Sequence, residues 1–308
     1  MRLVFAGTPA AAVPTLRRLA TEHEIVAVVT RPDAQLGRKR ILTASPVAQE
    51  AEALGIHVIK AARLDEDATG RIAALRPELG VIVAYGGLVR EPLLSTPAHG
   101  WINLHFSLLP AWRGAAPVQR ALIAGDAQLG VTVFQLVPAL DAGDVHLAQT
   151  FPVPDDATAD LALASLAEDG AALTSEAVAA IADGSARPVP QHGEATHAAK
   201  LSLADGLLDW TEPAEVVFAR YRGVTSEPGA HTSFEGAPMK VREIARAAEA
   251  ETLPPGELRG VKEGVLVGTA TEPLLLVRVQ PAGKPAMAAA DWFRGLHVAA
   301  DETVRFGA

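Results

Sequence analysis

Residues 1–30 read MRLVFAGTPA AAVPTLRRLA TEHEIVAVVT, and this stretch decides the fold class. Leu3–Ala6 and Ile25–Thr30 are unbroken apolar runs, as strands buried on both faces of a parallel sheet require. The segment between them, Ala10–Leu19, predicts a helix. A strand, a helix and a second strand in this order form the β-α-β unit of a parallel sheet.

The same alternation continues along the chain to about residue 137. Further strands are predicted at His57–Ala61, Gly80–Ala84, Trp101–His105 and Val131–Val137. Further helices are predicted at Pro46–Leu54, Ala68–Leu75 and Pro117–Ala124, with Ser45 and Pro46 as a start signal. Ala159–Ile181 predicts one long helix or two shorter ones. The first half is therefore expected to be an α/β fold, a doubly wound, mostly parallel sheet.

A change of pattern follows at residues 184–204, which hold prolines and glycines without periodicity. Beyond them, short strands are predicted at Ala230–Phe234, Met239–Ile244, Val265–Val267 and Leu274–Val279. Turns such as Pro254-Pro255-Gly256 separate these strands, which is typical of a small β-barrel or sandwich. We therefore expect a catalytic domain at 1–183, a linker at 184–204 and a β domain at 205–308.

Composition narrows the class of protein. The chain has no cysteine, which excludes a disulfide framework and a thiolate metal site or nucleophile. The apolar residues lie in short runs, so neither a membrane span nor a signal peptide is expected, and a cytoplasmic enzyme is the default. The net charge of −9 argues against a general nucleic-acid binder, so any tRNA partner needs a local basic patch.

Two common motifs are missing. The first turn, Gly7-Thr8-Pro9, is neither the G-x-G-x-x-G dinucleotide fingerprint nor a phosphate-binding P-loop. The chain also lacks a His-Glu-x-x-His pattern, and no metal is expected. Nicotinamide and nucleoside-triphosphate enzymes are therefore disfavoured.

Polar side chains that suit acyl chemistry lie in one predicted strand and just after the next one. Asn103 and His105 lie on one face of the strand Trp101–His105, and Asp141 follows the strand Val131–Val137. An Asn amide can donate to a developing oxyanion, a His can donate there or handle a proton, and an Asp can orient the His. A structural His and an ordinary turn at Leu140-Asp141-Ala142-Gly143-Asp144 explain these residues as well, so the pattern alone leaves both interpretations open.

A resemblance favours the catalytic interpretation. The segment Asn103-x-His105-x-Ser107-Leu108-Leu109-Pro110-x-x-Arg113-Gly114, followed by Leu140-Asp141-x-Gly143-Asp144, resembles the folate-dependent formyltransferase family. Further motifs resemble the branch of that family that acts on methionyl-tRNA; they are Phe5-Ala6-Gly7-Thr8-Pro9, Ser45-Pro46-Val47, Val83-Ala84-Tyr85-Gly86, Lys200-Leu201-Ser202 with Asp209-Trp210, and Gln280-Pro281-Ala282-Gly283-Lys284. The resemblance covers nearly the whole chain and implies a Rossmann-like formyltransferase domain followed by a small OB-like barrel.

The resemblance also implies roles for single residues. Asn103, His105 and Asp141 are the expected catalytic set. The expected folate contacts are Ser107, Leu108, Leu109 and Pro110 in one loop, with Tyr85 and Gly86 lining the pterin pocket. Phe106, where many members have glycine, and Gly87-Leu88 depart from the family pattern next to the expected folate pocket. The basic loop Arg31–Thr43 could be a plain solvated loop, but the family places tRNA contacts there, at Arg38, Lys39 and Arg40.

The implied reaction transfers a formyl group from 10-formyltetrahydrofolate to the methionine amine of initiator methionyl-tRNA, with a monomer as the expected state. The nearer rival is another reaction of the same family, formylation of a nucleotide-sugar amine or hydrolysis of the formyl folate. A non-catalytic RNA-binding protein is the distant rival. Formyl transfer to charged initiator tRNA, set against transfer to amino sugars or glycinamide ribonucleotide, separates these three.

Overall fold

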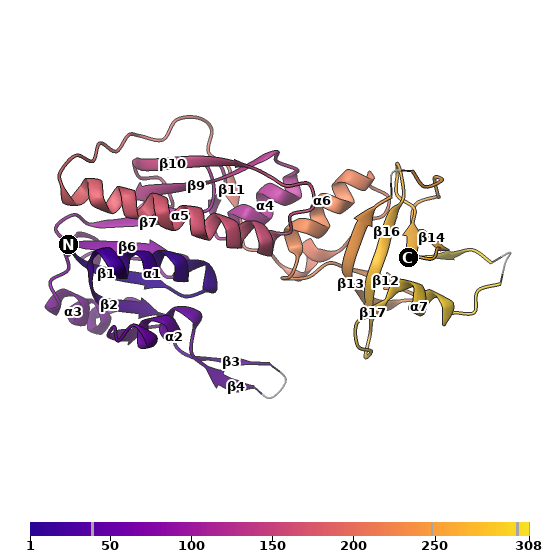
Figure 1. Ribbon diagram of the computed structural model, residues 1–308, viewed down its shortest axis with the longest axis horizontal. Helices are drawn as coiled ribbons and strands as arrows, with labels where there is room; N and C mark the ends of the chain where they lie inside the picture. Colours follow the sequence, from indigo (N-terminus) through magenta and orange to yellow (C-terminus); the bar gives the residue numbers. More distant parts are fainter. Residues whose placement is uncertain (38–39, 248, 300–301, 308) are drawn as a thin grey trace. The chain divides into compact units, whose positions relative to one another are not determined.

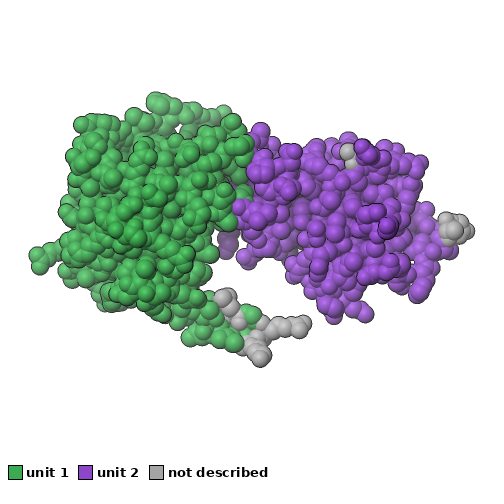
Figure 2. All heavy atoms as spheres, viewed as in Figure 1, with its two compact units in different colours: residues 1–117, 128–152, 162–198 green, residues 118–127, 153–161, 199–308 purple. Residues whose placement is uncertain are grey.

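The computed structural model describes residues 1–37, 40–247, 249–299 and 302–307. The chain divides into two compact units (Figures 1 and 2). Unit 1 comprises residues 1–117, 128–152 and 162–198, and unit 2 comprises residues 118–127, 153–161 and 199–308. Residues 184–198, which the sequence pattern assigns to a linker, therefore pack with unit 1.

Seven strands form the central sheet of unit 1, in the order β10-β9-β7-β6-β1-β2-β5. Their bounds are β1 Arg2–Gly7, β2 Glu24–Thr30, β5 Val58–Lys60, β6 Leu79–Val83, β7 Trp101–His105, β9 Gln128–Gln135 and β10 Val145–Pro152. The strands β7, β6, β1, β2 and β5 run parallel to one another, while β9 is antiparallel to β7 and β10 is antiparallel to β9. The prediction of a mostly parallel sheet in an α/β fold is confirmed.

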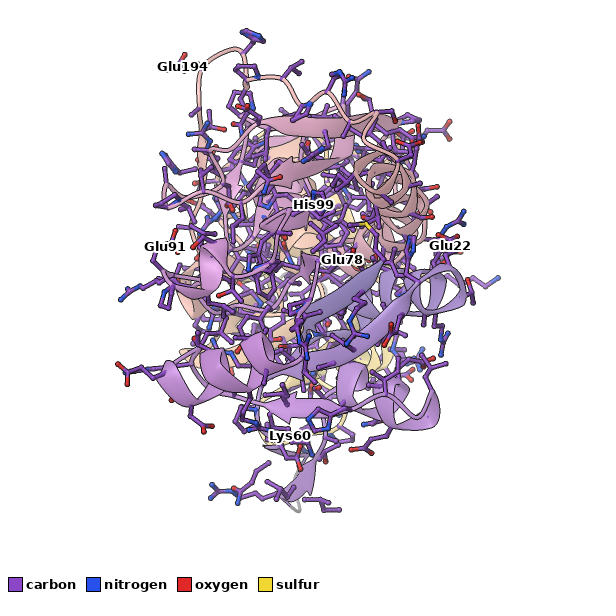
Figure 3. All side chains as sticks on the ribbon, turned by 90° about the vertical axis from the view of Figure 1, so that its left-hand side faces the viewer. Glu22, Lys60, Glu78, Glu91, His99 and Glu194 are labelled. Atoms are coloured by element: carbon purple, nitrogen blue, oxygen red, sulfur yellow. The ribbon has the colours of Figure 1, made fainter. Side chains whose placement is uncertain are left out.

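Figure 3 looks onto the amino-terminal edge of this sheet, where Glu78 and His99 lie near the middle of the view. Each precedes a strand, Glu78 before β6 and His99 before β7, and the His99 amide donates to the Glu78 carbonyl at 2.9 Å. Lys60, at the carboxyl end of β5, pairs with Asp33 at 2.8 Å.

Unit 1 contains five α-helices among its described residues, of which α2 and α3 begin at side-chain caps. Their bounds are α1 Val13–Glu22, α2 Pro46–Ala53, α3 Glu66–Ala74, α4 Pro117–Ala124 and α5 Ala159–Ala182, the last two shared with unit 2. The Ser45 hydroxyl accepts from the Ala48 amide at 3.0 Å, which caps α2 as predicted. The long helix predicted near residues 159–181 is a single helix, α5.

The first predicted helix starts later than the sequence pattern suggested. Residues Ala10–Ala12 form a 3-10 turn, η1, and α1 begins only at Val13. Pro14 has no amide hydrogen, so it cannot donate to the Ala10 carbonyl as an α-helix starting at Ala10 would require. The Val13 amide donates to Ala10 instead.

Among the described residues of unit 1, five strands in three places were not predicted from the sequence. The edge strand β10 is half exposed and so lacks a continuous apolar run. The loop Arg31–Thr43 contains a hairpin, β3 Ala34–Leu36 with β4 Ile41–Thr43 (Figure 1). The third is a two-residue parallel pair, β8 Arg113–Gly114 with β11 His197–Ala198.

Unit 2 is built on an antiparallel sheet in the order β12-β13-β16-β15-β14-β18, with β17 paired to β16. Its elements are β12 His231–Phe234, β13 Ala237–Arg246, β14 Glu257–Gly260, β15 Val265–Val267, β16 Leu274–Pro281, β17 Met287–Ala288, β18 Val304–Arg305, α6 Ala214–Val224 and α7 Ala289–Arg294. Phe306 stacks on Trp210 and Trp292 in its core, with 5.7 Å between ring centroids in each pair. The predicted small barrel-like sheet is confirmed.

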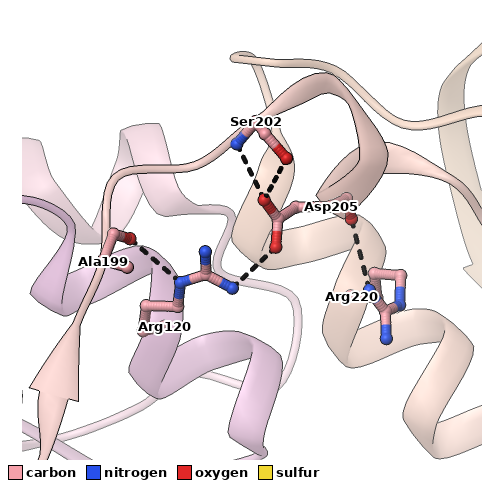
Figure 4. Close-up of polar contacts among 5 residues, drawn as sticks. All are labelled: Arg120, Ala199, Ser202, Asp205 and Arg220. Atoms are coloured by element: carbon pink, nitrogen blue, oxygen red, sulfur yellow. Dashed lines mark hydrogen bonds and ion pairs between the residues drawn. The ribbon is translucent and has the colours of Figure 1, made fainter.

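A charged cluster ties the start of residues 199–308 to helix α4 (Figure 4). Asp205 accepts from the Ser202 amide at 2.7 Å and from the Arg120 guanidinium at 2.7 Å. Arg120 also donates to the Ala199 carbonyl at 3.1 Å. The Ser202 amide first, and then Arg120, hold the pKa of Asp205 at about 2.

We expect Asp205→Asn to destabilise unit 2 by about 1–2 kcal/mol at neutral pH, because a charged acceptor and a cap of the 3-10 turn Leu203–Gly206 are lost. A depressed Asp pKa contributes stability above its unfolded value, and that stability disappears as pH falls through about 2. Thermal unfolding of the wild type and the variant should show a difference in unfolding free energy that is constant from pH 7 downward. This difference should disappear only as the pH approaches 2. Glu263→Gln, at an exposed position, is the matched control, and a difference that it reproduces would contradict this assignment.

Candidate active site

The strand β7 places Asn103 and His105 on the same face of the sheet. Leu104 between them packs against α5, where a Cβ on Gly170 would lie 2.8 Å from a Leu104 methyl carbon. Side chains alternate along a strand, so Asn103 and His105 face the side away from α5. The pattern of alternation predicted from the sequence therefore gives both groups to one site.

Asn103 carries an unsatisfied polar atom. Its Oδ1 is buried and has no hydrogen-bond partner among the described residues. A buried polar atom left without a partner costs about 1–3 kcal/mol. Such a cost in the middle of a well-paired strand is typical of a residue kept for function rather than for stability.

His105 is held in one tautomer by its neighbour in the following loop. It is 6% exposed, and its Nε2 donates to the Trp112 carbonyl at 2.9 Å. A carbonyl only accepts, so in the neutral ring Nε2 carries the hydrogen and Nδ1 keeps its lone pair. Burial lowers the pKa of His105, while the Asp141 carboxylate and the Trp112 carbonyl partly oppose that shift. The imidazole is therefore neutral at physiological pH.

Asp141 and Asp144 occupy different environments in one short turn. Asp141 is 9% exposed, and its Oδ2 accepts from the Gly114 amide at 2.8 Å, whereas Asp144 is exposed. Asp141 lies in the left-handed region at φ +45°, where a non-glycine residue is strained. The structure thus brings Asp141 into the electrostatic environment of His105 and leaves Asp144 at the surface.

The turn reaches the site because two loops run toward each other. Strand β9 is antiparallel to β7, so the chain leaves β9 at the amino end of β7, where Gln135 pairs with Ile102. Only glycine fits at Gly143, since a Cβ there would lie 1.8 Å from the Gln135 carbonyl oxygen. The loop after β7 returns to meet this turn, through the contact of Gly114 with Asp141.

A segment that the sequence pattern assigned to a linker contacts both loops that carry the candidate site residues. After α5 the chain runs along the outside of β10 (Figure 1), where Val189 forms a bridge with Val145, and Glu194 marks its outer rim in Figure 3. Thr196 accepts from the Trp112 amide through its hydroxyl at 2.8 Å and from the Arg113 amide through its carbonyl at 2.9 Å. Gln191 bonds both the Arg113 side chain and the backbone of the Asp141 turn. We call residues 184–198 the strap.

The loop Ser107–Pro110 is held in place by hydrogen bonds to the buried Thr132 of β9 and to the neighbouring Ala111. The Thr132 hydroxyl donates to the Ser107 carbonyl at 2.7 Å and accepts from the Leu109 amide at 3.2 Å. The Ser107 hydroxyl donates to the Ala111 carbonyl at 2.6 Å. A Cβ on Gly130 would lie 2.4 Å from the Leu108 side chain. Leu108, Leu109 and Pro110 are half-buried and so keep surface for a ligand.

Tyr85 and Gly86 follow β6, next to β7 in the sheet. The Tyr85 ring is 1% exposed, and its hydroxyl donates to the Ala61 carbonyl at 3.0 Å, so this residue can reach a ligand only through its main chain. Arg31 donates to the Gly86 carbonyl and lies 5.9 Å from the centre of the Tyr85 ring. Gly87 packs against that ring, since a Cβ there would lie 2.5 Å from it, and Phe106 is buried at 7% exposure.

The structure gives a partial view of the predicted tRNA contacts. Arg38 and Lys39 lie outside the described residues. Arg40 is exposed, and its guanidinium donates to the Gln35 side chain at 2.7 Å across the β3–β4 hairpin. No cluster of three or more His, Asp or Glu side chains suited to a metal occurs in the part of the chain that the structure describes. Within that same part, no helix is long and apolar enough to span a membrane.

Comparisons with known proteins show which proteins the chain is similar to. Residues 1–178 match the family described as formyl transferase, and residues 200–297 match its C-terminal domain. The chain is 58% identical to the methionyl-tRNA formyltransferase of Leifsonia xyli subsp. xyli, over 96% of this chain and 97% of that protein. It is 50% identical to the methionyl-tRNA formyltransferase of Thermobifida fusca, over 100% of this chain and 99% of that protein.

Solved structures with low sequence identity share the fold. A variant of HypX from Aquifex aeolicus has a TM-score of 0.69 at 18% identity, over 96% of this chain and 47% of that chain. The N-formyltransferase from Helicobacter canadensis, solved with folinic acid and dTDP-3-aminofucose, has a TM-score of 0.69 at 15% identity, over 91% of this chain and 98% of that chain.

Proposed function

This chain belongs to the formyl transferase family, and we propose that it transfers a formyl group from 10-formyltetrahydrofolate to the α-amino group of methionine on initiator methionyl-tRNA. The observation that carries the chemistry is that Asn103, whose Oδ1 is buried without a partner among the described residues, lies on the same strand face as the buried His105, with Asp141 acting on that histidine. Near-full-length identity to methionyl-tRNA formyltransferases supports the choice of acceptor.

In the proposed mechanism the methionine amine attacks the formyl carbon, so the site needs no nucleophile of its own. Asn103 donates to the oxyanion of the tetrahedral intermediate. His105, neutral and with Nδ1 unprotonated, accepts the amine proton, and as imidazolium it donates to the same oxyanion. Asp141 stabilises that imidazolium by its charge. The new C–N bond forms first and gives the tetrahedral intermediate. This intermediate then collapses as the bond from the formyl carbon to the folate nitrogen breaks, and His105 passes the proton that it took from the amine to that leaving nitrogen.

For the folate we propose two groups of contacts. The first is the loop of Ser107, Leu108, Leu109 and Pro110, whose rigid support by Thr132 pre-organises its surface. The second is the main chain of Tyr85 and Gly86. Both follow the carboxyl ends of adjacent parallel strands, β7 and β6, which is the usual place for ligands in such sheets.

For the tRNA we propose contacts from the basic loop and from residues 205–308, which would orient the acceptor end. We further propose a monomer that acts in the cytoplasm, where charged tRNA is used.

The direct test of the proposed function is an acceptor comparison with the full-length chain. With 10-formyltetrahydrofolate as donor, charged initiator tRNA should be formylated, and glycinamide ribonucleotide and nucleotide-linked amino sugars should not. Transfer to an amino sugar with none to charged tRNA would overturn the proposed acceptor, and release of formate alone would indicate a hydrolase.

Replacing Arg38, Lys39 and Arg40 together with alanine should raise the KM for tRNA and flatten its dependence on salt, because each lost phosphate contact lowers the salt slope by about 1. Folate KM should stay unchanged. The measurement is kcat/KM for tRNA across a salt series.

The matched control removes three exposed charges elsewhere in unit 1, with Arg18, Arg63 and Arg76 replaced by alanine. Equal salt slopes in the two triple variants would show that the basic loop is only a solvated surface.

A further inference from the structure

The Gln191 carboxamide lies between a guanidinium group and the turn that carries Asp141. Its Oε1 accepts from Arg113, at 2.6 Å from Nη2 and 3.2 Å from Nε. Its Nε2 donates to the carbonyls of Asp141 at 2.8 Å and Gly143 at 2.9 Å. Carbonyls only accept and guanidinium groups only donate, so these contacts fix which end of the amide faces the turn.

These bonds close a ring around Asp141. The Gly114 amide donates to the Asp141 side chain at 2.8 Å, and Gly114 is joined by a peptide bond to Arg113. Arg113 donates to Gln191, and Gln191 returns to the Asp141 main chain. Asp141 is thus held at its carboxylate by Gly114 and at its backbone carbonyl by Gln191. These two residues lie 27 and 50 positions from it in sequence.

The turn requires such support. Asp141 has φ +45°, a conformation that costs a non-glycine residue of order 1–3 kcal/mol and persists only where the surroundings impose it. Gly143 is locked against Gln135, but that contact fixes the far end of the turn. Gln191 acts on the carbonyl of the strained residue itself.

We propose that Gln191 is a positioning residue for the reaction, which holds the Asp141 carboxylate beside His105 and is itself oriented by Arg113. This inference rests on the proposed catalytic role of Asp141. Gln191 touches no reacting atom, so its effect passes through Asp141. A displacement of about 1 Å in such a group can cost up to about 10² in rate.

Two substitutions separate positioning from simple packing. Gln191→Met keeps the size and loses every hydrogen bond. Gln191→Glu keeps and strengthens the contact with Arg113, but its carboxylate cannot donate to the carbonyls of Asp141 and Gly143 and repels them. If Gln191 only tethers the strap to Arg113, Gln191→Glu remains close to wild type. If it positions Asp141, both variants lose turnover.

The experiment measures kcat and both KM values for formyl transfer to charged initiator tRNA by full-length Gln191→Met, Gln191→Glu, Asp141→Asn and the double variant Asp141→Asn with Gln191→Met. Gln149→Met, at an exposed position of β10, is the matched control. We expect either Gln191 variant to lose about 10- to 100-fold in kcat with folate KM changed less than about twofold. In the Asp141→Asn background the further loss should be under about threefold, because residues that act through one another are not additive.

Two results would overturn the inference. Losses that multiply in the double variant, or a Gln191→Glu variant with wild-type kcat, show that Gln191 does not act through Asp141. If Asp141→Asn itself turns over like wild type, the proposed catalytic role of Asp141 falls first and this inference falls with it. Circular dichroism and thermal unfolding identify any variant that has lost its fold, and the other Gln191 variant then decides.

Discussion

Replacing Asn103 with alanine is expected to lower kcat by about 10²- to 10³-fold without loss of stability. The rate loss follows from removing one donor to the oxyanion. The stability is retained or slightly increased, because the buried Oδ1 that the substitution removes has no partner within the described residues. A residue that lowers the stability of the fold but increases the reaction rate is typical of an active site. The measurements are single-turnover formyl transfer, thermal unfolding and folate binding.

His105→Ala is expected to show a comparable loss of transfer, but unlike Asn103→Ala it should also be less stable than the wild type. It breaks the bond to the Trp112 carbonyl and leaves a cavity against Phe134, whose ring centre lies 6.4 Å away. Gln128→Ala, at the exposed start of β9, is the control for both variants. A folded Asn103→Ala enzyme with full activity would remove Asn103 from the mechanism.

Asp141→Asn is expected to lose about 10²-fold or more in transfer and to shift the pH dependence of what remains. Burial already lowers the pKa of His105, and the Asp141 carboxylate opposes that shift. Without the carboxylate the His105 pKa falls further. His105 acts as a base when neutral, so wild-type activity falls as pH drops through its lowered pKa, and in Asp141→Asn that acid limb moves to still lower pH.

The comparison with Asp144→Asn makes this prediction specific. Asp144 is exposed, and its main chain, not its side chain, accepts the Gln135 amide at 2.8 Å. Asp144→Asn should therefore retain most activity and the wild-type acid limb. Rate–pH profiles of the two purified variants decide the matter, and an inactive Asp144→Asn beside a nearly wild-type Asp141→Asn would reverse the assignment.

The elements best predicted from the sequence are those whose signals are local. Strand β7 and helix α4 have the bounds that the sequence pattern gives, because the apolar residues Trp101, Ile102 and Leu104 and a proline at the first helical position fix them within a few residues. Strand β10 was missed because its exposed residues, 148–150 and 152, do not alternate with buried ones and so show no period of two. The start of α1 was misplaced because Pro14 has no amide hydrogen and cannot donate to the Ala10 carbonyl, so the first turn is a 3-10 turn.

In the candidate site, too, the features set by local sequence could be predicted and those set by distant residues could not. Asn103 and His105 share a strand, so their common face follows from alternation. Gln191 lies 50 residues from Asp141, and Thr196 lies 84 residues from Trp112. Nothing in the composition of a segment with prolines and glycines indicates that it folds back onto the site. The Pro and Gly residues there suit a connector equally well, and only tertiary structure separates the two uses.

The strap has a consequence for the order in which the protein matures during synthesis. When residue 183 has left the ribosome, the whole of the sheet and all three candidate catalytic side chains have already been made. Gln191, which anchors the Asp141 turn, and Thr196, which anchors Trp112 in the loop after β7, have not yet been made. A nascent chain stalled at that length would hold a formed sheet with an unsupported reaction centre, and competence would arrive only with the next fifteen or so residues, as the β11 pairing with β8 completes the unit. A fragment designed for independent expression should therefore be extended through Ala198, not cut where helix α5 ends at Ala182.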